Sequence, residues 1–206
     1  GMMPTTADRG DMTVGLEAAV EDLRGKLSGE KICWERFYAS SSAAGGLRMT
    51  VHGLVYDMTV KAAKEAALGA GAVIKMVTSG KLTEDDLQKV AAIDPNLILV
   101  AVGVDYGERE TSLYNAEKLA DLGLKSHVIY AGNVQNIDSV ARIFQRRGQK
   151  VYVVENVYPK VDILNVEPAR SAIKAAFEEH ITEAAGMGSI REIVDGTIIP
   201  TPGAVM

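Results

Sequence analysis

The sequence has little that could cross-link the chain covalently, because Cys33 is the single cysteine among 206 residues. One cysteine excludes an internal disulfide, and the protein is expected to fold in a reducing compartment such as the cytoplasm. Cys33 lies beside Trp34 with no histidine near it in the sequence. We therefore interpret it as a structural thiol rather than a nucleophile.

Aromatic residues, positive charge and long apolar runs are also scarce. Aromatic side chains make up 5% of the chain, so the core must be built from Val, Ile, Leu, Ala and Met. The net charge of −5 lacks the positive face that a nucleic-acid binder needs. No apolar run reaches the roughly 18 residues of a membrane span. We expect neither nucleic acid nor a membrane among the partners.

The usual catalytic and metal-binding motifs are missing. The histidines His52, His127 and His180 are scattered, and no Cys or His pair has metal-ligand spacing. Around His52, Thr50 and Val55 stand where a histidine-ligated cobalamin loop of the form Asp-x-His-x-x-Gly needs Asp and Gly. There is no Gly-x-Ser-x-Gly nucleophile elbow. We assign no catalytic residue and no metal site.

The most distinctive segment present is a run of eight small residues, Ala39–Gly46, directly before an apolar stretch. Without bulky side chains, backbone can closely approach another backbone or a phosphate. The segment can therefore be a tightly packed crossing between two elements or a cradle for an anion. No Lys-Ser/Thr pair follows the glycines, which favours the first interpretation. We interpret Ser40–Gly46 as a hinge-like crossing into the first regular strand.

Hydrophobic periodicity predicts a regular alternation of strands and helices. Strands are predicted at residues 32–38, 47–56, 73–77, 97–102, 127–130 and 151–154. Helices are predicted at residues 13–27, at residues 108–122, 136–146 and 168–184, and after a Thr83–Asp86 capping box. Another helix, rich in alanine, is predicted to be capped by Thr59 and to end at Gly69 or Gly71. A short helix and a Pro-Thr-Pro tail, interpreted as a linker, are expected within residues 188–206.

This alternation, with short connections, indicates a parallel sheet covered on both faces. Residues 97–102 are apolar throughout, as a strand buried on both faces requires. The predicted fold is α/β, a flavodoxin-like, three-layer, doubly wound parallel sheet with extra N- and C-terminal helices. The predicted domains are 1–46 (helix, strand and small-residue crossing), 47–156 (the flavodoxin-like domain) and 157–206 (helices and Pro-rich tail).

Ligands of open α/β sheets bind beyond the carboxyl ends of the strands. Small and polar residues follow the predicted strands here, which suits a pocket rim and equally suits turns and helix caps. Together with the small-residue segment they give the candidate ligand-binding residues, which are Ser40, Ser41, Ser42, Gly45, Gly46, Ser79, Gly103, Asp105, Gly107, Gly132, Asn133 and Asn156.

Several segments, in order along nearly the whole chain, resemble the MutL family, the accessory proteins of adenosylcobalamin-dependent glutamate (methylaspartate) mutase. They include Ser40–Met49, Ala66–Ala72, Asn165–Arg170 and Asp195–Pro202. This family is distinct from the mismatch-repair protein of the same name. The resemblance implies an actin/Hsp70/sugar-kinase type of ATPase, in the hydantoinase-related branch, that chaperones or reactivates a cobalamin-dependent mutase.

The resemblance also implies two phosphate loops that are not found in this sequence. One lies near the amino terminus of such proteins, and an Asp-x-Gly-Gly-type loop lies well downstream. The segment from Asp105 to Glu108 departs from a phosphate loop, because Tyr106 is bulky and the charge of Glu108 repels a phosphate. The chain is expected to be a middle fragment with no cofactor of its own, and ATP with Mg²⁺ is assigned to the full-length protein.

Two functions from different classes follow. The first is a non-catalytic interaction or regulatory region that contacts the subunits of a cobalamin-dependent mutase. The alternative is a flavodoxin-like domain that binds a corrinoid or an anion through its strand-end loops. A stand-alone enzyme is disfavoured because no paired acid, base or nucleophile is evident. Formation of a homodimer is left open.

Overall fold

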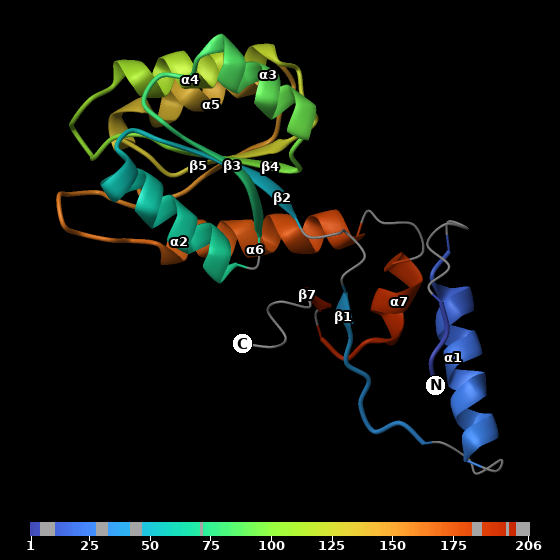
Figure 1. Cartoon of the computed structure of the whole chain (residues 1–206). Coiled ribbons are helices and arrows are strands. Elements are labelled where there is room, and N and C mark those ends of the chain that lie inside the picture. The colour runs from blue at the N-terminus through green and yellow to red at the C-terminus, as the bar shows by residue number, and fades with distance from the viewer. Residues whose placement is uncertain are drawn as a thin grey trace. The chain divides into compact units, whose positions relative to one another are not determined.

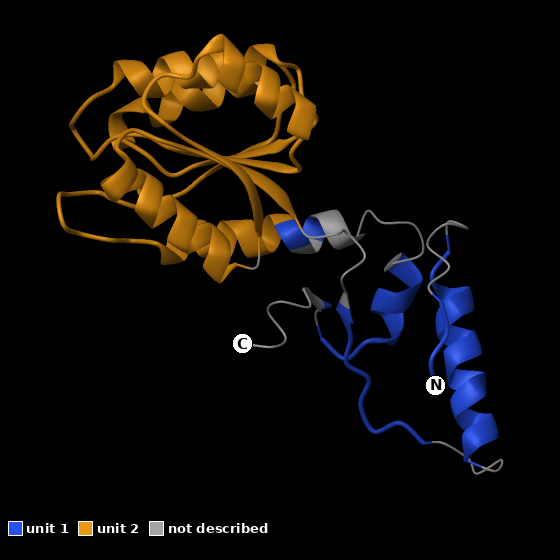
Figure 2. Ribbon diagram, viewed as in Figure 1, with its two compact units in different colours: residues 1–45, 177–206 blue, residues 46–176 orange. Residues whose placement is uncertain are grey.

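The computed structural model describes residues 1–4, 11–27, 33–41, 47–70, 72–182, 187–196 and 198–200. The chain divides into two compact units, shown in different colours in Figure 2. Residues 46–176 form the larger unit, and residues 1–45 with 177–206 form the smaller unit. The larger unit is therefore one continuous segment of the chain. The smaller unit consists of two segments, one before and one after it in the sequence.

The larger unit is built on five parallel strands. They are β2 (Arg48–Gly53), β3 (Val73–Ser79), β4 (Leu97–Ala101), β5 (His127–Tyr130) and β6 (Val151–Val153). Its helices are α2 (Lys61–Gly69), α3 (Glu84–Ile93), α4 (Glu110–Asp121) and α5 (Ile137–Gln145), with a π-helical turn at Tyr56–Val60 and a 3₁₀ turn at Val134–Asn136. The part of α6 (Glu167–Thr182) up to residue 176 also belongs to this unit. The strand order β3-β2-β4-β5-β6 is that of a flavodoxin-like sheet.

Helices cover both faces of this sheet, with α3, α4 and α5 on one face and α2 and α6 on the other (Figure 1). The predicted doubly wound α/β fold is confirmed. All five residues of β4 are buried because the strand lies at the centre of the sheet beneath both helical layers. This explains why residues 97–101 are apolar without alternation.

Side chains of β4 and β5 pack with α3, α4 and α5 into one cluster of buried residues. The cluster comprises Leu82, Leu87, Val90, Ile98, Val100, Val102, Ala116, Leu119, Ala120, Val128, Tyr130, Val140 and Phe144. On α2, the buried side chains are all alanines. From α6, Ala169, Ile173 and Ala176 are buried, so the larger unit extends to residue 176, beyond the domain boundary predicted at residue 156.

Local signals in the larger unit give one confirmation and one correction. Thr83 and Asp86 form the predicted capping box of α3, since each side chain accepts a hydrogen bond from the other's backbone N–H. The prediction that Thr59 caps the next helix is wrong. The chain already turns at Tyr56, and the Thr59 hydroxyl instead accepts the N–H groups of Leu54 and Val55, at 2.8 and 3.2 Å.

The smaller unit contains α1 (Thr13–Lys26), α7 (Met187–Ile193) and a two-stranded parallel sheet. The sheet pairs β1 (Ser40–Ser41) with β7 (Ile199–Pro200). The predicted helix at 13–27 is confirmed. Residues 33–38 are not a strand as predicted, and Ile199–Pro200 pairs with another strand rather than serving only as a linker. The sequence could not reveal this pairing, because two residues are too few to show a period.

Candidate functional site

The carboxyl ends of β4, β5 and β6 bring together six of the twelve candidate residues. They are Gly103, Asp105, Gly107, Gly132, Asn133 and Asn156. These residues lie in three neighbouring loops because β4, β5 and β6 are adjacent parallel strands whose ends meet at one edge of the sheet. The sequence-based prediction of a shared edge therefore holds for these positions.

Asp105 and Asn156 connect the loop after β4 to the loop after β6. The Asn156 amide donates to a carboxylate oxygen of Asp105 at 2.9 Å and to the Gly103 carbonyl at 3.0 Å. The same Asp105 oxygen accepts the backbone N–H of Val134 at 2.9 Å. Asn156 in turn accepts the N–H of Tyr158 at 3.0 Å. These polar groups hold the three loops together.

Asn133 is buried at the centre of the same network. Its side-chain oxygen accepts the N–H groups of Tyr106 and Gln135, at 3.1 and 3.0 Å. Its amide nitrogen donates to the carbonyls of Gly107 and Glu108, at 3.3 and 3.2 Å. Each polar atom of the side chain therefore has protein partners, which is how a buried amide avoids a large desolvation cost.

The Tyr130 hydroxyl lies beneath this network, on the core side. It donates to the Asn133 carbonyl at 2.8 Å and lies 3.2 Å from the Ser112 hydroxyl. Burial raises the pKa of Tyr130 to about 12, so the phenol stays protonated at neutral pH. Tyr130 supports the Asn133 loop as a neutral hydrogen-bond donor.

Helix N-termini are the natural phosphate sites at such an edge, and here the protein's own oxygens occupy them. A carboxylate oxygen of Glu108 accepts the N–H of Thr111 in the first turn of α4 at 2.7 Å. The α3 terminus is closed by Thr83 and Asp86. The backbone N–H groups of Val134 and Gln135 are also taken, by Asp105 and Asn133 as described above. The first turns of these helices therefore do not fit a nucleotide phosphate.

The glycines of the edge are needed by the packing of the loops. A Cβ on Gly132 would lie 2.7 Å from the Val102 carbonyl oxygen, and one on Gly103 would lie 2.9 Å from the Glu108 carbonyl oxygen. Gly103 also has a φ of +82°, which side-chain-bearing residues rarely adopt. Protein atoms, rather than open space for a ligand, lie where these Cβ atoms would be.

The other candidate residues lie elsewhere. Ser79 is exposed at the end of the edge strand β3. Ser40 and Ser41 belong to β1 of the smaller unit, where Ser40 also lines a hollow of about 350 Å³. Ser42, Gly45 and Gly46 lie outside the described residues, so the interpretation of that segment as a crossing or an anion cradle stays a prediction.

Apolar side chains are exposed on the same loops whose polar groups bond to one another. Tyr106 is 78% exposed and Val134 is 40% exposed. Ile163 and Leu164, in the loop that follows β6, are 48% and 52% exposed. Asp105 N–H donates to the Pro159 carbonyl at 3.0 Å, which attaches this last loop to the loop that carries Tyr106. We call Tyr106, Val134, Ile163 and Leu164 the apolar rim.

His52 has a strongly altered pKa. It is fully buried in β2, and its ring nitrogens lie 2.7 Å from the Thr78 hydroxyl and 3.0 Å from the Thr50 hydroxyl. Burial lowers the pKa of His52 to about 4, so the ring is neutral at pH 7. Within the part of the chain that the structure describes, no group of three His, Cys, Asp or Glu side chains is placed to hold a metal.

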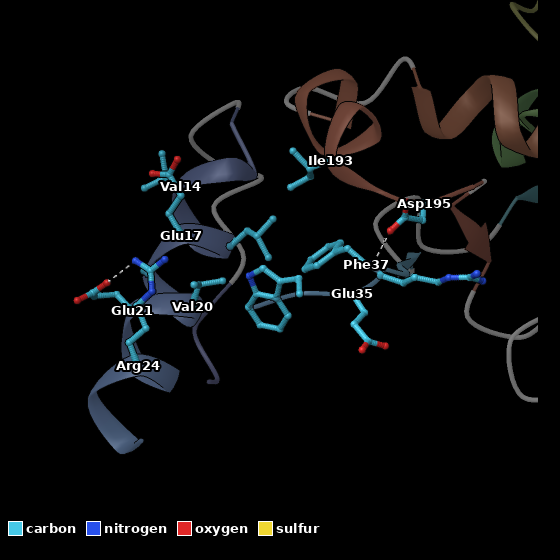
Figure 3. Close-up of a pocket in the computed structure, with 13 residues that line it drawn as sticks. Val14, Glu17, Val20, Glu21, Arg24, Glu35, Phe37, Ile193 and Asp195 are labelled. Carbon is cyan, nitrogen blue, oxygen red and sulfur yellow. Dashed lines mark hydrogen bonds and ion pairs between the residues drawn. The ribbon is translucent and has the colours of Figure 1, made fainter. Parts of the chain in front are cut away.

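The smaller unit also contains a groove of about 840 Å³ that was not predicted from the sequence (Figure 3). It is lined by α1, by residues 34–37 and by Ile193 and Asp195. Residues 34–37 were predicted to be part of a strand, so their place in the wall of a groove was not expected. One signal was available, because Trp34, Phe37 and Tyr38 supply three of the chain's eleven aromatic residues within five positions.

The larger unit is an α/β, doubly wound, flavodoxin-like domain. Its strand-end loops are joined to one another by hydrogen bonds. A family model described as MutL protein matches residues 1–206. The chain belongs to the MutL family. "Protein MutL" of Clostridium tetanomorphum is 40% identical over 210 residues, covering all of this chain and 46% of that protein. The chain thus spans about half the length of this curated relative.

Two solved structures show a distant likeness to this chain. The sugar isomerase domain of an RpiR transcription factor from Sphaerobacter thermophilus has a TM-score of 0.41 at 12% identity, over 74% of this chain and 80% of that one. A putative pilus assembly-related protein from Burkholderia pseudomallei K96243 also has a TM-score of 0.41, at 16% identity, over 71% of this chain and 94% of that one. No helix in the described ranges is long and apolar enough to cross a membrane.

Proposed function

We propose that this chain is a non-catalytic interaction region of a MutL-type accessory protein, and that it contacts the subunits of a cobalamin-dependent carbon-skeleton mutase. Membership of the MutL family along the whole chain supports this assignment. The structural observation that supports it most is a contrast between the polar and the apolar side chains of the strand-end loops. Their polar side chains bond to one another, whereas the apolar rim is exposed.

Exposed apolar side chains gathered on adjoining loops are typical of protein contact sites. The loops beneath the rim are rigidly joined, since Asp105, Asn133 and Asn156 link all three of them. A preorganised surface loses little conformational entropy when a partner binds. Tyr106 also holds a φ of +62°, an uncommon backbone conformation for a residue other than glycine. The rim is therefore a fixed surface that a protein partner can contact directly.

The test is calorimetric titration of this chain with purified glutamate mutase subunits. We expect saturable binding that weakens at least about tenfold when Ile163→Asp and Leu164→Asp are combined, because charges replace side chains that the complex would bury. Leu68→Asp is the matched control, since Leu68 is 59% exposed on α2, away from the rim. Absence of binding by the unaltered chain, or equal weakening by the control, would contradict the proposal.

The same proposal expects no ATP turnover and no tight nucleotide binding by this chain alone. The closed N-termini of α3 and α4 support this expectation, because Glu108 and Asp86 place carboxylates where a phosphate would bind. Titration with ATP and Mg²⁺ measures it directly. A micromolar affinity for ATP would count against the proposal.

The alternative function is binding of a corrinoid or an anion at the same edge. The gathering of Asp105, Asn133 and Asn156 there favours it, because ligands of open α/β sheets bind at this edge. A shift of the cobalamin absorption spectrum on mixing with the protein would support this alternative. If Asp105→Ala combined with Asn133→Ala left such binding unchanged, the ligand would not bind at the strand-end loops.

A further inference from the structure

The smaller unit exposes several large apolar side chains. Among the residues of α1, only Gly15 is buried. Val14, Trp34 and Ile193 are 47%, 51% and 53% exposed. All three line the same groove of about 840 Å³. Large side chains that are half-exposed around one groove indicate a surface that another molecule covers.

The walls of the groove carry an excess of negative charge. Four carboxylates, those of Glu17, Glu21, Glu35 and Asp195, line it together with the two guanidinium groups of Arg24 and Arg36. Dashed lines in Figure 3 mark the partners of two of these carboxylates.

Glu21 pairs with Arg24 at 3.3 Å, and Asp195 accepts the backbone N–H of Phe37 at 2.7 Å. Glu17 and Glu35 are exposed and make no ion pair with any residue that the structure describes. The groove therefore offers apolar side chains together with two carboxylates that are open to a cationic partner.

From these features we propose that the groove binds a short, positively charged amphipathic helix of a partner protein. Apolar side chains of that helix would cover Val14, Trp34 and Ile193, and its Lys or Arg residues would lie opposite Glu17 and Glu35. A helix about 10 Å across fills about 840 Å³ with about two turns. This is the helix-in-groove mode of recognition, and the negative charge of the groove selects a positively charged helix. The surface is separate from the apolar rim of the larger unit.

Trp34 makes this proposal directly testable. It is the single tryptophan of the chain, so intrinsic tryptophan fluorescence reports on the groove alone. The probe is a 14-residue helical peptide of leucine and lysine, and the control is the same peptide with glutamate in place of lysine. We expect a saturable blue shift of the Trp34 emission with the lysine peptide, weakening as NaCl is raised. No shift, or an equal shift with the glutamate peptide, would overturn the proposal.

Charge-reversal variants separate specific binding from general attraction to an acidic protein. Glu17→Lys with Glu35→Lys is expected to weaken binding of the lysine peptide about tenfold or more. Glu65→Lys with Glu117→Lys makes the same change in net charge at exposed positions of α2 and α4, and is expected to change binding less than about twofold. Equal weakening by both pairs would overturn the proposal.

Two further outcomes decide whether the groove itself is the binding site for the peptide. Ile193→Asp is expected to weaken binding of the peptide, whereas Ile163→Asp, on the apolar rim, leaves it unchanged. If the rim variant weakened binding equally, the groove would not be the site. A dimer in sedimentation equilibrium that is dissociated by Ile193→Asp would also overturn the proposal, because a second copy would then cover the groove.

Discussion

At the scale of single residues, His52 couples stability to pH. Its pKa is lowered from 6.5 to about 4 by burial, although Asp86 partly opposes the shift. Between these two pH values the unfolded chain binds a proton that the folded chain does not, so the free energy of unfolding falls as the pH is lowered. The expected loss is about 3 kcal/mol from pH 7 to pH 4. Urea unfolding at several pH values measures it.

A matched pair of variants assigns this effect to one side chain. His52→Gln removes the titrating group while keeping a polar side chain between Thr50 and Thr78, and is expected to flatten the stability profile between pH 6.5 and 4. His127→Gln leaves the buried site intact and should retain the slope. The assignment to His52 would be wrong if both variants kept the slope of the unaltered protein.

Gly132 tests whether the strand-end glycines are needed for packing. Because a Cβ there would meet backbone atoms of Val102 at 2.7 and 2.8 Å, neither of which can rotate away, Gly132→Ala is expected to cost about 2 kcal/mol. Gly123 has open space around its Cβ position and a φ of +62°, so Gly123→Ala should cost only about 1 kcal/mol. The urea midpoints of the two variants measure this difference. Equal midpoints would show that the Cβ position of Gly132 is not restricted by packing.

At the scale of elements, the capping box of α3 is a local device with a measurable contribution. The Thr83 hydroxyl accepts the Asp86 N–H at 3.2 Å, and the Asp86 carboxylate accepts the Thr83 N–H at 2.9 Å. The Thr83 N–H and the Thr83 hydroxyl both donate to the Asp86 carboxylate, which lowers the pKa of Asp86 below its usual value. Thr83→Ala is expected to cost about 1 kcal/mol in thermal or urea unfolding, and Thr83→Ser much less. If Thr83→Ala left the free energy of unfolding unchanged, the capping box would not be stabilising.

Elements with a strong local pattern could be predicted from the sequence, and those without one could not. The strands predicted at 97–102 and 127–130 are confirmed as β4 and β5, because buried parallel strands select apolar, β-branched residues. Residues 33–38 also contain large apolar side chains, but Trp34 and Phe37 line a groove instead of entering a sheet. Pairing of Ser40 with Ile199 depends on a contact across most of the chain, which no local pattern encodes.

The same distinction applies to the candidate site. Positions such as Asp105 and Asn133 could be predicted to share an edge, because topology alone places the ends of parallel strands together. Their hydrogen-bond partners could not be predicted, because the same side-chain atoms of Asn and Asp can stabilise a turn, cap a helix or bind a ligand. Only the geometry shows that Asn133 bonds to Tyr106 and Gln135, and that Glu108 closes the start of α4.

At the scale of the whole molecule, the two units differ sharply in how much they bury. The larger unit has a continuous core on both faces of its sheet. Among the residues of the smaller unit whose burial the structure describes, only Gly15, Phe177 and Ile198 are buried. Hydrophobic burial is the main stabilising contribution to folding, so the two units should differ in stability by several kcal/mol.

This difference predicts two separate unfolding transitions in urea. Trp34 fluorescence reports on the smaller unit, whereas far-UV circular dichroism is dominated by the helices of the larger unit. We expect the fluorescence transition at a lower urea concentration than the dichroism transition. Residues 46–176 expressed alone should reproduce the dichroism transition, because they contain the whole five-stranded sheet and its cluster of buried residues. Coincident transitions, or a fragment that does not fold, would show that the two units stabilise each other and form one cooperative structure.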